Sequence, residues 1–135
     1  MEIYLRNFII IVVGSSALIG CSSGYEEIKT KHKELIINYG LTQFEKGKWK
    51  VSNPTHRGEM IKSLFLKHKF MGKNVSYVKD LLGQRDCYID YEHAPCYELI
   101  YEGYYYYLVF GIGHPSSEDN DVRNKVITIE LFERG

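Results

Sequence analysis

The clearest alternation of hydrophobic and polar positions lies in the middle of the chain. Between Arg57 and Lys69, apolar residues recur every three or four positions, which predicts an amphipathic helix. Its opposite side is expected to carry the polar residues Glu59, Lys62, Ser63, Lys67 and Lys69. A second helical pattern follows Asn74, a residue suited to cap a helix, and ends at Gly83. Because a short turn joins the two helices, we expect them to pack as a hairpin.

Beyond Gly83 the pattern changes to that of strands. Three runs rich in β-branched and aromatic residues predict strands at Tyr97–Glu102, Tyr104–Gly111 and Lys125–Glu133. Glu102 and Gly103 fit the tight turn of a hairpin. The predicted fold class is therefore α+β, with a two-helix hairpin packed on a three-stranded antiparallel sheet.

The segment before these elements has weaker patterns. Apolar residues between Glu26 and Tyr39 recur at near-helical spacing, so a short helix is expected there, with Gly40 as its stop. Phe44 and Trp49 flank a polar stretch, which predicts a loop whose aromatic residues fold onto the core.

The first twenty residues have a composition of their own. About twelve mostly apolar residues, Phe8–Ile19, follow a single positive charge, and this length suits a signal peptide better than a spanning helix of roughly twenty residues. The run ends in Leu18-Ile19-Gly20-Cys21, which resembles the lipobox of bacterial lipoproteins. The resemblance implies cleavage before Cys21 and a lipid on its thiol, and Ser22 after it implies the outer membrane, facing the periplasm. An uncleaved N-terminal anchor is the alternative.

These patterns divide the chain into three parts. Residues 1–20 are predicted to be the signal peptide, residues 21–55 a lipidated tether and N-terminal segment, and residues 56–135 one small α+β domain. The whole chain has 17 basic and 17 acidic residues, and losing Arg6 and Glu2 with the signal peptide keeps it neutral. Nucleic acid is therefore not an expected partner, and membrane contact is expected through the lipid anchor.

Cysteine and histidine are the residue types here that could form a disulfide or bind a metal. With Cys21 assigned to lipid, Cys87 and Cys96 remain as a possible disulfide in an oxidising compartment, and two buried free thiols are the alternative. The five histidines are spread singly along the chain. They do not form a metal-ligand pattern, so neither a metal nor another cofactor is expected.

The helical segment also carries a family resemblance. Arg57-Gly58-Glu59-Met60, Gly72-Lys73-Asn74 and Leu81-Leu82-Gly83, followed by a strand-rich tail, resemble the SmpA/OmlA (BamE-like) small outer-membrane lipoproteins. The resemblance covers about residues 57–133 and implies two helices on a three-stranded sheet and an accessory role in β-barrel assembly. Gln84-Arg85-Asp86 departs from the family, which usually has Pro two residues after Leu-Gly. The same unit resembles half of the β-lactamase inhibitory protein, which implies the alternative of a periplasmic inhibitor or immunity lipoprotein blocking a secreted enzyme or toxin.

Four consecutive tyrosines are the candidate binding residues. On a strand, Tyr104 and Tyr106 share one face while Tyr105 and Tyr107 share the other. One pair is expected to cover the helices and the other to be partly exposed for a partner, although shielding of the sheet is an equal alternative. Since no catalytic motif is present, the sequence predicts a non-catalytic lipoprotein that binds another envelope protein.

Overall fold

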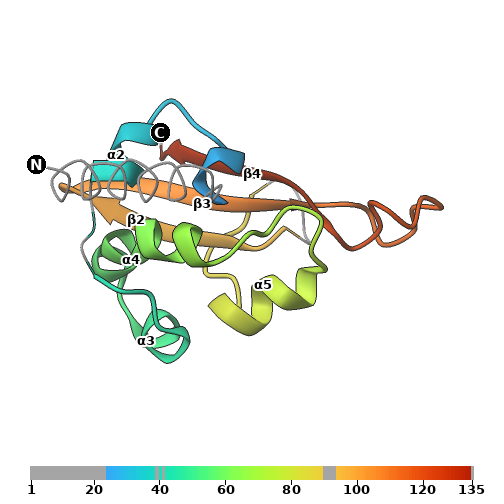
Figure 1. Cartoon of the computed structure of the whole chain (residues 1–135), viewed down its shortest axis with the longest axis horizontal. Helices are drawn as coiled ribbons and strands as arrows, with labels where there is room; N and C mark the ends of the chain where they lie inside the picture. Colours follow the sequence, from blue (N-terminus) through green and yellow to red (C-terminus); the bar gives the residue numbers. More distant parts are fainter. Residues whose placement is uncertain (1–23, 39, 41, 90–93, 135) are drawn as a thin grey trace, which may run out of the picture.

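The computed structural model describes residues 24–38, 40, 42–89 and 94–134, and Figure 1 shows their arrangement. Residues 1–20, predicted to be a signal peptide, and Cys21 lie outside the described residues. The elements follow in the order η1 (Gly24–Glu27), β1 (Ile28–Lys29), α2 (Lys33–Asn38), α3 (Lys46–Val51), α4 (Pro54–Lys67), α5 (Val75–Leu82), β2 (Cys96–Tyr101), β3 (Tyr104–Ile112) and β4 (Val126–Glu133).

The sheet has four strands in the order β1-β4-β3-β2. The three predicted strands are present within one or two residues of their predicted bounds, and Tyr101 pairs with Tyr104 across the predicted hairpin turn. The sheet is mixed, however, because β1 pairs with β4 in parallel. The prediction of a purely three-stranded antiparallel sheet was therefore wrong in its finer detail, while the α+β class is confirmed.

The helices begin and end at residues suited to those positions. Asn53 caps α4 by accepting a hydrogen bond from the His56 amide at 2.9 Å, and Asn74 caps α5 by accepting from the Ser76 amide at 3.0 Å. Gly83 ends α5 with a φ of 80°, a conformation that favours glycine.

The packing of the helices differs from the predicted hairpin. α4 lies over β2, whereas α5 lies against α3. α3 itself occupies part of the stretch predicted as a loop, although its Trp49 is buried with Phe44 as expected. The predicted helix at residues 26–39 is replaced by η1, β1 and the shorter α2. The fold thus contains four α-helices rather than two among the described residues.

A single main core joins the helices to one face of the sheet. Tyr106, Leu108 and Phe110 of β3 point into it. The helices and the preceding segments contribute Ile28, Ile36, Phe44, Trp49, Met60, Ile61, Leu64, Phe65, Val78 and Leu82 to the same cluster. Each of the four described α-helices contributes to this core, so none of them lies over the opposite side of the sheet.

Candidate functional site

The sheet side away from the core, here called the outer face, is the first candidate site. Strand register places its residues: Ile100 lies opposite Tyr105, Glu98 lies opposite Tyr107, and Tyr107 lies opposite Phe132. Side chains alternate between the two faces of a strand, so these residues all project away from the core residues Tyr106 and Leu108. The outer face therefore presents a row of aromatic side chains across β3 and β4.

These aromatic side chains are accessible to a partner. The residue Tyr105 is 48% exposed and Phe132 is 37% exposed. Tyr107 is half-buried because its ring packs edge-on against Phe132, with the ring centroids 5.7 Å apart. Edge-to-face pairs of this kind fix the orientation of both rings.

Arg134 holds the two tyrosines of the outer face. Its guanidinium carbon lies 5.8 Å from the ring centroid of Tyr105 and 5.9 Å from that of Tyr107. Its backbone amide donates to the Tyr105 carbonyl at 2.8 Å, and its guanidinium lies 3.8 Å from the Glu98 carboxylate. Because the cation sits over both rings, they lose less side-chain freedom when a partner covers them.

The other two tyrosines belong to the helix-facing side. Tyr106 is only 5% exposed and makes edge-to-face ring contacts with Tyr101 and His32. Burial raises the pKa of the Tyr106 hydroxyl above its ordinary value, and the nearby negative charge of Glu133 raises it further. Tyr104 shares this face as expected but is 60% exposed, because it stands at the strand end beside the hairpin turn. The structure thus covers one tyrosine of this pair, not both.

A second, smaller cluster covers one end of the outer face. Cys87 and Cys96 lie at disulfide distance, with their Cα atoms 5.2 Å apart. They are buried with Ala94 and Val109, and Ile89 and Tyr107 pack against this cluster. Cys87, Ile89 and Ala94, called here the cover, therefore pack over the Val109 end of the outer face, whereas the Tyr105 end is exposed.

A partly buried ion pair links Asp86, just before the cover, to α4, and the sequence pattern did not reveal it. The guanidinium of Arg57 on α4 pairs with the Asp86 carboxylate, and its Nε donates to the Trp49 carbonyl at 3.1 Å. Asp86 also accepts from the Glu98 amide at 3.1 Å. Twenty-nine positions separate Arg57 from Asp86, so only the folded chain brings the pair together.

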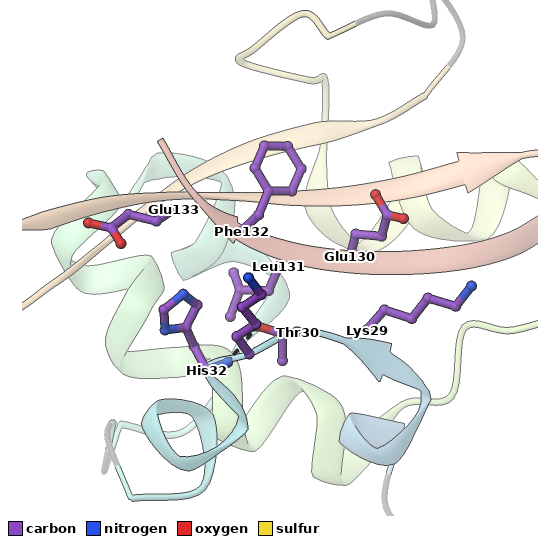
Figure 2. A pocket seen from close by; sticks show the side chains of 8 residues that line it. Lys29, Thr30, His32, Glu130, Leu131, Phe132 and Glu133 are labelled. Atoms are coloured by element: carbon purple, nitrogen blue, oxygen red, sulfur yellow. Dashed lines mark hydrogen bonds between the residues drawn. The ribbon is translucent and has the colours of Figure 1, made fainter. Parts of the chain in front are cut away.

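A cleft of about 560 Å³ opens between β1 and β4, at the edge of the sheet that is farther from β2 (Figure 2). Lys29, Thr30, Lys31 and His32 form one wall, and the other wall consists of Glu130, Leu131, Phe132 and Glu133. Its volume lies within the usual range of ligand pockets. The sequence analysis missed it, because β1 itself was not predicted.

In the described part of the chain, no three His, Cys, Asp or Glu side chains gather in a way that would hold a metal ion, and no helix has the length and apolarity to cross a membrane. Comparison with known proteins found no matching family model, curated protein or solved structure.

Proposed function

We propose that this protein is a non-catalytic lipoprotein that binds another envelope protein through its outer face. In this proposal Cys21 carries the lipid, the domain faces the periplasm from the outer membrane, and the role is in envelope or β-barrel assembly. The lipobox-like Leu18-Ile19-Gly20-Cys21 supports the anchoring, and the resemblance of residues 57–133 to SmpA/OmlA lipoproteins supports the role.

The open end of the outer face is the observation that carries the binding function. Tyr105, Tyr107 and Phe132 form a contiguous aromatic row on the side of the sheet opposite the main core. Aromatic residues and arginine are the types that concentrate in protein interfaces, and Arg134 lies over two of the rings. Exposed apolar groups arranged in this way favour a protein partner over a solvent-facing role.

The charges around the row indicate what the partner presents. Glu98 and Glu130 flank the aromatic side chains on β2 and β4, and Arg134 already lies near Glu98. A partner surface with an apolar centre and basic residues at its rim complements this arrangement.

The test compares a double variant of the outer face with a matched control. Tyr105→Ala combined with Tyr107→Ala removes the two rings that lie under Arg134, neither of which lines the cleft, whereas Val51→Ala truncates an apolar residue that is 86% exposed on α3. Chemical crosslinking in intact envelopes, followed by quantitative recovery of the crosslinked neighbours, measures binding. Losing interface tyrosines commonly costs about 2 kcal/mol or more, so we expect roughly thirtyfold weaker recovery for the double variant only.

Equal recovery from the double variant, the control and the wild type would remove the outer face as the binding surface. The identity of the recovered neighbour then separates the roles. An envelope-assembly protein supports the proposal, whereas a secreted hydrolase or toxin favours the inhibitor alternative.

A further inference from the structure

The edge of β4 beside β1 is only partly occupied. β1 pairs with β4 through two residues, Ile28 with Ile129 and Lys29 with Glu130. Beyond them, β4 continues to Glu133 in register with β3, while the chain after Lys29 moves away toward α2 (Figure 2). Within the described chain, Leu131 to Glu133 therefore have a strand neighbour on the β3 side alone.

The divergence is stabilised by specific contacts. The His32 amide donates to the Thr30 hydroxyl oxygen at 2.9 Å, which turns the backbone locally instead of extending β1. The His32 ring then packs edge-on against Tyr106, with centroids 5.1 Å apart. Since these contacts hold the chain away from β4, the cleft is part of the folded structure.

Backbone geometry places hydrogen-bonding groups in this cleft. The Arg134 amide donates to the Tyr105 carbonyl, so the main-chain groups of Arg134 face β3. Main-chain groups of successive residues in a strand point to opposite edges. The N–H and C=O of Glu133 therefore point to the cleft side, where a further strand would find them.

The two walls of the cleft carry opposite charges. Lys29 and Lys31 line one wall, and Glu130 and Glu133 line the other. A purely anionic ligand would meet the two carboxylates, and a purely cationic one would meet the lysines. An extended polypeptide offers carbonyl acceptors to the cationic wall and amide donors to the carboxylates.

We propose that an extended segment of a partner protein binds in this cleft by adding as a strand to the edge of β4. Main-chain hydrogen bonds to the edge would supply affinity, as in other cases of strand addition. This site goes beyond the proposed outer-face function, since binding would use the main-chain groups at the edge of β4; of the aromatic row, only Phe132 also lines the cleft.

The experiment uses the full-length chain in detergent and a defined probe. The probe is the capped, fluorescent peptide Lys-Val-Thr-Val-Glu, and its matched control replaces the first valine and the threonine with proline, so that a donor to the strand ladder is lost in either register. Fluorescence anisotropy measures binding. We expect the proline peptide to bind about tenfold more weakly or worse, because a main-chain donor and the extended geometry are lost.

Two variants at one position isolate the edge of β4. Glu133→Ala removes the carboxylate but keeps the amide, whereas Glu133→Pro also removes the amide that points to the cleft. We expect the proline variant to bind the probe about tenfold more weakly than the alanine variant. Hydrogen exchange on the wild type gives a readout that does not depend on either variant folding: the probe should slow exchange of the Glu133 amide.

Several results would overturn strand addition. They are equal binding of the two peptides, no binding of the probe at about 1 mM, or unchanged exchange at Glu133. Tyr105→Ala separates this site from the outer face, since it should leave probe binding unchanged. If the outer-face variant keeps its neighbours while the probe still binds the cleft, the outer-face function is refuted and strand addition stands. If the outer-face variant loses its neighbours but the probe does not bind, strand addition is refuted and the outer-face function stands.

Discussion

The close approach of α4 to β2 leads to a sharp prediction about Gly58. A Cβ atom added at Gly58 would stand 2.4 Å from the Ile100 carbonyl oxygen, which belongs to the backbone of β2. Ordinary contact begins at 3.4 Å, so Gly58→Ala requires α4 to move by about 1 Å from the sheet.

The expected magnitude follows from two opposing terms. Alanine is favoured over glycine inside a helix by about 1 kcal/mol. Forcing extra volume into a packed contact typically costs about 1–3 kcal/mol, and here the displaced helix also carries the buried Met60, Ile61 and Leu64. We expect Gly58→Ala to lower the free energy of unfolding by up to about 2 kcal/mol.

Gly47 on α3 is the matched control. A Cβ at Gly47 meets no atom within 4 Å, so Gly47→Ala should raise the free energy of unfolding by about 0.5–1 kcal/mol. The single tryptophan of the chain, Trp49, is fully buried and reports urea unfolding by fluorescence. Shifts of the same sign for both variants would refute the close packing of α4 on β2.

Three further outcomes are expected. Cys21→Ala should abolish incorporation of a fatty-acid analogue and cleavage after residue 20, and continued labelling would contradict the lipoprotein proposal. Alkylation of the exported protein under denaturing, non-reducing conditions should leave Cys87 and Cys96 unmodified, whereas two alkylated thiols would exclude their bond. Burial lowers the pKa of His68 from 6.5, and the positive charge of Lys67 lowers it further. Protonation of His68 therefore favours the unfolded chain. The free energy of unfolding should therefore fall between pH 7 and about pH 5, and fall less in His68→Gln; equal falls would argue against a lowered pKa.

The elements predicted well are those whose signal is local. The strands β2 to β4 are rich in β-branched and aromatic residues along their lengths, and Glu102-Gly103 marks the turn, where both residues have positive φ values. The helix α4 shows an apolar stripe, and α5 follows the predicted asparagine cap, Asn74. Such signals depend on neighbours a few positions apart, which a sequence displays directly.

The elements predicted poorly depend on distant partners. β1 has two residues, too few to show a strand period, and is defined by its pairing with Ile129 and Glu130. α3 contributes a single buried side chain, Trp49, so no apolar stripe marks it as a helix. Ser63, expected on the polar side of α4, is buried because its hydroxyl accepts from the Phe44 amide at 2.8 Å.

For the candidate sites too, the sequence predicted features with a local pattern and missed those that depend on distant segments. Alternation alone placed Tyr105 and Tyr107 on one face, but the exposure of Tyr104 follows from its position at the strand end. The cleft beside β4 arises where two distant segments part, and no pattern within either segment indicates it.

The position of β1 near the start of the described fold limits how far this strand can lie from the proposed lipid attachment at Cys21. Ile28 lies seven residues after Cys21, and fully extended chain covers about 3.3–3.6 Å per residue. With Cys21 lipidated as proposed, the first strand can stand no more than about 25 Å from the lipid attachment point. The cleft follows directly after that strand, so a segment that enters it must come from a region of the partner close to the bilayer.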